Sequence, residues 1–447
     1  MTASNPPQVS AEMRRRVVIS STIGNALEWF DFTVFGLFAG VIAKHFFPAD
    51  NPSNSLLLTF ATFGIAFAAR PIGGLVFGIY ADKNGRKRAM IVMIMMMAVG
   101  TGLIGILPTY QAIGIAAPIC VLLARLIQGF SAGGEFGSAS AMLIEFAPPG
   151  RRGYYGSWQM VSQMLAFAIG ASFAFTLSSR LSPEAFDSWG WRVPFILGVL
   201  IGPVGFYLRR AIDETPEFKA LMATRGTVEN SPLSDVIRQY PRELVTAFCM
   251  IAVGTAINYV AGVYITTYAV TELKLKLADA QFGLIVFSAL NAVVVVFSGW
   301  LSDKIGRRNV LLPSVILYCI LFYFMLSRLV ANPTVENLYW LQATSLLLGM
   351  LAGPAPAAMS EIFPVRLRST GVSLVYNLAV MLFGGLAPFI NTWLVQSTGN
   401  KLAPVFYIFF AAAVGIVGFV LYREPPPAGL AKGDDDNRSS APSPAGG

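Results

Sequence analysis

Twelve runs of mainly apolar residues, most near the roughly 20 residues that a membrane-spanning helix needs, divide this sequence and limit the folds open to it. Only 13% of the 447 residues are charged, against roughly 25% in soluble domains. The deficit extends along the whole chain, so we expect an all-helical integral membrane protein with twelve transmembrane helices. The expected spans are 17–43, 55–80, 89–108, 113–143, 154–178, 192–210, 243–270, 280–301, 309–329, 337–359, 370–395 and 404–422.

Basic residues in the loops predict how these spans are oriented. With a cytoplasmic N-terminus, the loops and termini on that side hold 23 of the 32 lysines and arginines, and the opposite side holds 7. The remaining two, Arg70 and Arg125, fall inside spans. The positive-inside rule therefore favours two cytoplasmic termini, and it explains the net charge of +8 without nucleic-acid binding. No small-residue cleavage site follows a short apolar core, so we expect the first span to be retained.

The sequence offers little for metal or cofactor chemistry. Cys120, Cys249 and Cys319 lie in separate apolar segments, and His45 is the single histidine. We therefore expect no metal site, no disulfide and no cofactor. No nucleophile elbow or phosphate-binding loop is present, which argues against a membrane-embedded enzyme.

Two loop motifs occur twice along the chain, in the same order. GIYADKNGRK at 78–87 is matched by GWLSDKIGRR at 299–308, which sets Asp82 and Asp303 221 residues apart. The pattern E-x-x-P-x-x-x-R begins at Glu145 and again at Glu361, 216 residues later. Nearly equal offsets predict two homologous six-helix bundles in parallel orientation. The expected units are an N-terminal segment 1–16, bundles 17–210 and 243–422, a linker 211–242 and a disordered tail 423–447.

The repeated loop G-x-x-x-D-x-x-G-R-[KR] resembles the signature loop of the major facilitator superfamily, and RLIQGFSAGG from Arg125 resembles its second motif. The chain resembles, more narrowly, the metabolite:proton symporter family. The resemblance implies alternating access, a proton as the coupling ion, no other cofactor, a monomer, and a bacterial inner membrane. The matching stretches are GNALEWFDF at 24–32, RPIG at 70–73, QGFSAGGEFG at 128–137, WGWRVPF at 189–195 and ETPEF at 214–218.

Three further stretches resemble the citrate/tricarballylate:proton branch of that family: LLTFATFG from Leu57, PTYQAIGIAAP from Pro108 and SWQMVSQ from Ser157. Trp29 departs from that branch, where Gln is expected, and matches the 2-oxoglutarate and shikimate branches. The three matching stretches make citrate or a related tricarboxylate the expected substrate. A dicarboxylate such as 2-oxoglutarate, shikimate, and an osmolyte such as betaine or proline are the alternatives. The short tail lacks the heptads often found in osmosensing members.

Five ionisable residues lie inside the spans of the first half, where each ionised group costs roughly 2.5–3.5 kcal/mol. At 1.5 Å per residue, Glu28 lies roughly 16 Å along the first span, near the midplane. Arg70 and Arg125 lie at similar depth, so these groups must pair with one another or face a watery cavity. The five residues are Glu28, Asp31, Arg70, Arg125 and Glu135.

A translocation site would give these residues different tasks. The planar guanidinium group fits a carboxylate through two parallel bonds, so Arg125 is the predicted substrate clamp and Arg70 the second candidate. Burial favours the protonated form of a carboxylate and arginine favours the ionised form. Asp31, Glu28 or Glu135 is therefore the predicted proton carrier. Structural ion pairing is the simpler explanation for Glu28, Arg70 and Glu135.

Uncharged polar residues complete the predicted binding site, although hydrogen bonding between helices would also explain them. No Lys, Arg, Asp or Glu lies deep in the spans of the second half, so the first half would hold the charge of a polyanion. The predicted polar residues of the site are Asn25, Gln159, Gln163, Asn258, Tyr259, Tyr264, Tyr376 and Asn377.

The repeated loops have a separate predicted role. The resemblance implies that they form a gate on the cytoplasmic side, where an aspartate caps a helix and binds basic partners. Positive-inside anchoring would explain the arginines but not the aspartates or glycines. The predicted gating residues are Asp82, Gly85, Arg86, Glu145, Arg152, Asp303, Gly306, Arg307, Glu361 and Arg368.

Overall fold

Every regular element in the described part of the chain is a helix. The computed structural model describes residues 11–49, 51–84, 86–210, 232–363 and 368–424. Within these residues nine helices are long and apolar enough to cross a membrane, and one bent pair of helices adds a tenth. Two shorter apolar helices, 91–106 and 116–132, lie where the third and fourth spans are predicted. The observed helices therefore match the twelve predicted spans in order.

The first six spans and their loops comprise thirteen helical segments, because several spans are bent or broken. They are α1 (Ala11–Leu37), α2 (Ala39–Phe46), α3 (Pro52–Ala68), α4 (Arg70–Asn84), α5 (Arg86–Ile106), α6 (Tyr110–Ile113), α7 (Ala116–Ala132), α8 (Glu135–Glu145), α9 (Arg152–Arg180), α10 (Pro183–Ser188), η1 (Gly190–Arg192), α11 (Val193–Gly198) and α12 (Ile201–Arg210), of which α10 lies in a loop.

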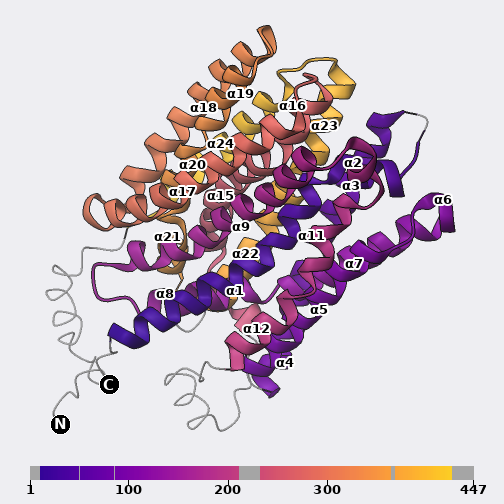
Figure 1. The fold of residues 1–447 in the computed structure, drawn as a ribbon. Coiled ribbons are helices and arrows are strands. Elements are labelled where there is room, and N and C mark those ends of the chain that lie inside the picture. The colour runs from indigo at the N-terminus through magenta and orange to yellow at the C-terminus, as the bar shows by residue number, and fades with distance from the viewer. Residues whose placement is uncertain (1–10, 50, 85, 211–231, 364–367, 425–447) are drawn as a thin grey trace, which may run out of the picture.

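The second six spans follow the short helix α14 (Pro232–Gln239). They are α15 (Pro241–Tyr259), η2 (Val260–Tyr264), α16 (Ile265–Thr271), α17 (Leu277–Ile305), α18 (Arg307–Ala331), α19 (Val335–Ala343), α20 (Leu346–Ala352), α21 (Ala355–Ile362), α22 (Arg368–Ala379), η4 (Val380–Gly385), α23 (Ala387–Thr398) and α24 (Ala403–Leu421). The helices of residues 11–210 gather on one side of the bundle and those of 241–421 on the other (Figure 1). The predicted unit boundaries stay predictions, since 211–231 and 425–447 lie outside the described residues.

Local sequence explains several helix ends. The Asn51 side chain accepts a hydrogen bond from the Ser53 N–H at 2.9 Å, and Pro52 occupies the first turn of α3, where no N–H is needed. Gly399 ends α23 in the left-handed conformation, with φ 64°. Gly306, with φ 93°, makes the turn between α17 and α18.

Several spans are interrupted within the membrane. Gly133 and Gly134 separate α7 from α8, and Thr344 and Ser345 separate α19 from α20. The π-helical turns η2 and η4 interrupt the seventh and eleventh spans. Irregular backbone at this depth is tolerated only where it is buried in protein or lines a cavity. The breaks therefore point to a functional interior.

Glycines bring the second and fourth spans into backbone contact. A Cβ atom on Gly129 would lie 1.7 Å from the Ala66 carbonyl oxygen, and one on Gly73 would lie 1.8 Å from that of Phe130. No larger side chain fits at either position, as is common where membrane helices cross closely. This crossing carries Arg70 and Arg125 into the interior of the first half.

The two halves contact each other at both ends of the bundle. At one end, the Ser178 hydroxyl of α9 donates to Gln281 Oε1 of α17 at 2.9 Å. A separate contact joins α23 to the start of α3, where Gln396 Nε2 donates to the Ser53 carbonyl at 3.2 Å. The interior between the halves is thus covered on this side.

A second set of contacts, here named the basic-end clasp, joins the halves at the opposite end and consists of Gly153, Tyr154, Asp303, Arg307 and Glu361. The Asp303 carboxylate accepts the backbone N–H groups of Gly153 at 2.8 Å and Tyr154 at 2.9 Å. Arg307 Nη1 lies 2.7 Å from Asp303 Oδ1, and Arg307 Nη2 lies 3.3 Å from Glu361 Oε1. A carboxylate at the start of α9 is favoured by the unpaired N–H groups there.

We expect Asp303→Asn to loosen the basic-end clasp, because a neutral amide loses the charge-assisted bonds to α9 and Arg307. A reporter cysteine at Ala355, which lines the interior cavity, should then react several-fold faster with a soluble maleimide. The three native cysteines are replaced by serine in this background.

The matched control is Asp279→Asn, which removes a carboxylate from the first turn of the same helix, at its far end. Labelling rates that are equal in the two variants would show that the clasp does not depend on Asp303.

Candidate functional site

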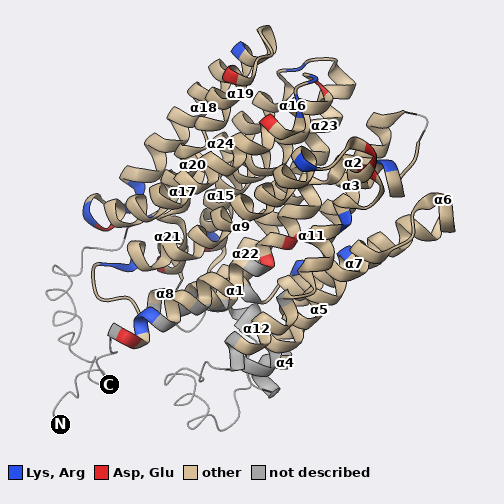
Figure 2. Cartoon of the chain, in the orientation of Figure 1, with Lys and Arg blue, Asp and Glu red and all other residues tan. Residues whose placement is uncertain are grey.

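Charged residues lie mostly at the two ends of the bundle, but a small group of both signs lies midway, beside α1 and α7 (Figure 2). Glu28, Asp31, Arg70 and Arg125 belong to this group, and none has more than 5% of its surface exposed. Unpaired charges at this depth are costly, so partners are required. The four residues form two ion pairs, both inside the first half.

The first pair joins Asp31 of α1 to Arg125 of α7. Arg125 Nη1 lies 3.2 Å from Asp31 Oδ2. Asp31 Oδ1 accepts hydrogen bonds from the Thr101 hydroxyl and from Gln128 Nε2, each at 2.6 Å. Gln128 Oε1 in turn accepts from Arg125 Nη1 at 2.8 Å. Helices α1, α5 and α7 thus hold one fully buried carboxylate with three donors.

Aromatic rings enclose Arg125. Its Cζ atom lies 4.8 Å from the ring centroid of Phe32, 4.4 Å from that of Phe35 and 5.5 Å from that of Phe63. Ring faces attract a desolvated cation and offset part of its burial cost. Arg125 Nε and Nη2 make no hydrogen bond. The cation is therefore held in place while part of its donor capacity remains unused.

The second pair joins Glu28 of α1 to Arg70 of α4, with 2.6 Å between Arg70 Nη2 and Glu28 Oε1. Arg70 Nε and Nη1 make no hydrogen bond. Tyr259 and Tyr376 of the second half lie within electrostatic reach of both members of this pair. The pair therefore lies at the boundary between the halves.

A cavity of about 720 Å³ lies between the halves, next to the Glu28–Arg70 pair. Tyr259 and Tyr376, which interact electrostatically with this ion pair, line the cavity. Among the residues that the structure describes, none that lines this cavity is charged. Its other walls include Trp29, Phe136, Met160, Gln163, Met164, Met250, Thr255, Asn258, Ala355 and Met359.

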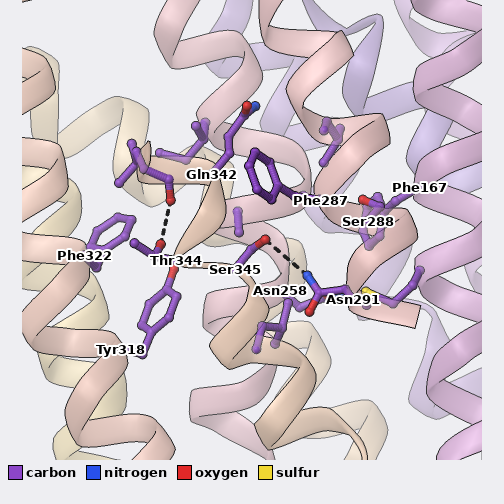
Figure 3. A pocket seen from close by; sticks show the side chains of 17 residues that line it. Phe167, Asn258, Phe287, Ser288, Asn291, Tyr318, Phe322, Gln342, Thr344 and Ser345 are labelled. Carbon is purple, nitrogen blue, oxygen red and sulfur yellow. Dashed lines mark hydrogen bonds between the residues drawn. The ribbon is translucent and has the colours of Figure 1, made fainter. Parts of the chain in front are cut away.

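A smaller cavity of about 450 Å³ adjoins the first and shares Met164, Asn258 and Leu348 with it. It lies mainly within the second half and is closed on one side by Phe167 of α9. Its polar wall is uncharged (Figure 3). Besides Asn258, this wall consists of Ser288, Asn291, Tyr318, Gln342, Thr344 and Ser345.

The predicted polar residues divide into two groups. Gln163, Asn258, Tyr259 and Tyr376 line the large cavity. The others line neither cavity described here, and several of them join helices. They are Asn25, Gln159, Tyr264 and Asn377, and both arginines are also absent from the cavity walls.

The contacts of Asn25 and Asn377 illustrate the second group. Asn25 Nδ2 donates to the Gln159 carbonyl at 3.3 Å and also to the Ser162 hydroxyl, which ties α1 to α9. Asn377 Nδ2 donates to the Gly133 carbonyl at 2.8 Å, across the two halves. The hydrogen-bonding explanation therefore accounts for these two positions.

The predicted gating residues are only partly described. Asp303, Arg307 and Glu361 form the basic-end clasp, Gly306 precedes α18, and Arg152 is exposed at the start of α9. Gly85 lies outside the described residues, as do the side chains of Asp82, Arg86, Glu145 and Arg368 and that of the predicted proton carrier Glu135. Among the residues that were described, no group of His, Cys, Asp and Glu is arranged to hold a metal ion.

Sequence reasoning missed the residues that surround the Asp31–Arg125 pair. Gln128 follows Arg125 by three residues, so the helical period placed both on one face. Thr101 gave no signal, because a single threonine in an apolar span is common. The aromatic enclosure of Phe32, Phe35 and Phe63 was equally hidden, since these rings are ordinary core residues in any membrane bundle.

Comparisons with known proteins agree with this architecture. Residues 17–232 match the family model described as "Sugar (and other) transporter", and residues 246–443 match that of the "Major Facilitator Superfamily". A solved structure of a proton:xylose symporter has a TM-score of 0.72 at 14% identity, covering 93% of this chain and 97% of that one. A D-xylose-proton symporter has a TM-score of 0.68 at 16% identity, covering 92% and 98%. These structures confirm the predicted twelve-helix fold.

Sequence relatives cover nearly the whole chain. A citrate-proton symporter of Klebsiella pneumoniae is 40% identical over 91% of both chains. A citrate-proton symporter of Salmonella typhi is 38% identical, over 93% of this chain and 95% of that one. A putative proline/betaine transporter of Staphylococcus aureus is 34% identical, over 93% and 89%. The chain is a multi-pass membrane transporter, not an enzyme, and it belongs to the major facilitator superfamily and, within it, to the metabolite:proton symporter family.

Proposed function

We propose that this protein imports citrate or a related tricarboxylate together with protons, by alternating access. The buried Asp31–Arg125 pair carries this proposal, because a proton and a substrate carboxylate both act on it. The two citrate-proton symporters among the relatives support the choice of acid. The proposed setting is a bacterial inner membrane, with both termini in the cytoplasm and the protein acting as a monomer.

Asp31 is the proposed proton carrier. A proton on its carboxylate cancels the negative charge and leaves the positive charge of Arg125 uncompensated in a low-dielectric interior. A substrate anion bound nearby restores electrical balance. The proton and the anion therefore stabilise each other's binding, which is the coupling that symport requires. Glu28, paired with Arg70, is the second candidate, and Glu135 keeps its predicted role as the third.

The contacts favour Arg70 over Arg125 as the group that meets a substrate carboxylate, the reverse of the order that the sequence suggested. The Arg70 side chain donates to Glu28 and, like Arg125, keeps two nitrogens without a partner. It interacts electrostatically with both Tyr259 and Tyr376, which line the large cavity, whereas of these two only Tyr259 interacts with Arg125. Arg125 is enclosed by three aromatic rings and bound to Asp31 and Gln128.

The basic-end clasp is the proposed cytoplasmic gate. Release of Asp303 from the start of α9 would let the two bundles rock apart at that end around the central cavity. We predict the same gating role for the corresponding loop of the first half, which contains Asp82, Gly85 and Arg86. Glu145, Arg152 and Arg368 are proposed to support the two loops.

A zwitterionic osmolyte is the second candidate substrate. The large cavity is lined by Trp29, Tyr259 and Tyr376, together with methionines, and by no charged residue. Aromatic faces bind quaternary ammonium groups, and putative proline/betaine transporters are among the relatives. 2-Oxoglutarate and shikimate are further alternatives, because Trp29 matches the branches that carry them.

Transport by the purified protein in proteoliposomes tests the proposal directly. An inward proton gradient should drive accumulation of labelled citrate, and a protonophore should abolish it. Tricarballylate, 2-oxoglutarate, shikimate, betaine and proline are then added as competitors. Proton-driven uptake of labelled betaine or proline, without any citrate uptake, would show that the substrate is the osmolyte and not the tricarboxylate.

Asp31→Asn should abolish proton-driven accumulation and retain exchange of substrate across the membrane, because the amide keeps the shape but cannot carry the proton. Accumulation and counterflow are measured on the same preparation. Glu336→Gln, an exposed carboxylate beside Trp340, is the control and should behave as wild type. If Asp31→Asn still accumulates substrate against a gradient, Asp31 is not the proton carrier, and Glu28 or Glu135 takes that role.

Arg70→Lys should weaken citrate binding roughly tenfold to hundredfold, because lysine keeps the charge and loses the planar pair of bonds, each worth about 1.5–3 kcal/mol. Arg125→Lys should change affinity less and mainly disturb coupling. Calorimetric titration at fixed pH measures both variants after monodisperse elution. A larger loss of citrate affinity in Arg125→Lys than in Arg70→Lys would show that Arg125 binds the substrate carboxylate.

A further inference from the structure

The internal repeat relates buried charges of the first half to uncharged residues of the second. The offset of 221 residues that links Asp82 to Asp303 also links Arg70 to Asn291. The shared sequence around the two aspartates fixes this register over the second and eighth spans. An arginine in one half thus corresponds to an asparagine in the other.

Two further alignments extend the correspondence. RLIQGFSAGG at 125–134 aligns with SLLLGMLAGP at 345–354 through four identical residues, which sets Ser345 opposite Arg125. GNALEW at 24–29 aligns with GTAINY at 254–259, which sets Asn258 opposite Glu28. Three of the four buried ionisable residues therefore correspond to uncharged residues in the second half.

The counterparts meet in the smaller cavity. Asn291 Nδ2 donates to the Ser345 hydroxyl at 3.1 Å, and both residues line the cavity together with Asn258 (Figure 3). In the first half the equivalent positions are filled by ion pairs. Smaller neutral side chains in the second half line a cavity instead. The cavity is thus the uncharged equivalent of the proposed proton-coupling cluster.

The wall of this cavity has features that packing alone does not explain. Ser345 belongs to the break between α19 and α20, and Ser288 lies one turn before Asn291 on the same face of α17. Asn258 is only 7% exposed, and its Oδ1 atom makes no hydrogen bond. A buried acceptor without a donor is costly, and broken helices in membranes surround binding sites. Both observations indicate a ligand with a hydrogen-bond donor.

We propose that the smaller cavity is a second subsite, which receives the hydroxyl group of the organic acid while the first half holds its carboxylates. This inference rests on the proposed function. An alcohol group donates to an acceptor such as Asn258 Oδ1 and accepts from a serine hydroxyl. An ionised carboxylate has no proton to donate, and the described residues of the cavity wall include no charged side chain. The subsite therefore selects hydroxy acids over acids of the same skeleton without the hydroxyl.

Matched pairs of acids test the subsite: citrate with tricarballylate, and malate with succinate. Binding is titrated calorimetrically at fixed pH. Wild-type protein should bind the hydroxy acid of a pair more tightly. Ser288→Ala should weaken binding of the hydroxy acid about five- to tenfold, the effect of one lost hydrogen bond, and leave the other acid unchanged. Thr344→Val, which removes a second hydroxyl from the wall, provides an independent variant if Ser288→Ala does not elute as a monodisperse protein.

Ser314→Ala is the matched control, since Ser314 is a buried serine that lines neither cavity and bonds to the Val310 carbonyl at 2.7 Å. Preference for hydroxy acids that persists in both cavity variants, or losses that are equal for both members of a pair, would overturn the subsite and leave the proposed function standing. Wild-type protein that binds no member of either pair would overturn the proposed function and the subsite together.

Discussion

Burial of the Asp31–Arg125 pair at mid-membrane is the constraint that shapes the first half of this protein. A desolvated ion pair is stable only when its remaining donors and acceptors are satisfied or shielded. Thr101 and Gln128 bond the carboxylate, and aromatic rings cover the guanidinium group. Gly129 allows the backbones of α7 and α3 to touch. Helix crossings, ring positions and polar residues thus serve one electrostatic requirement.

Hydrophobic runs were enough to predict the helices, because a membrane span needs a fixed length of apolar sequence. The buried ionisable residues were also predictable, since so few are tolerated there. Their partners were not. Glu28 and Asp31 lie three residues apart on one face, yet each binds a different arginine. Helical spacing predicts the helix face on which a residue lies. Which partner the residue contacts depends on how the neighbouring helices cross.

The cavities were the least predictable feature for a related reason. The positions of the cavities depend on breaks such as Thr344–Ser345 and on the π-helical turns. The π-helical turns consist mainly of apolar residues, as the regular helices around them do, so the sequence gives no clear signal for them. Asn377 shows the same limit, because an asparagine that joins two halves looks identical in sequence to one that binds a ligand. The first half thus buries charged residues at mid-span, whereas the cavity walls described in the second half are uncharged.

The balance of charge within the first half has an electrical consequence. Glu28 and Asp31 together offset Arg70 and Arg125, so these four residues carry no net charge when all are ionised. Moving one elementary charge through a membrane potential of 100 mV costs about 2.3 kcal/mol. A neutral set of fixed groups can change its exposure from one side to the other without such work. Membrane voltage then acts on the protons and anions that travel with the loaded protein rather than on the return of the empty one.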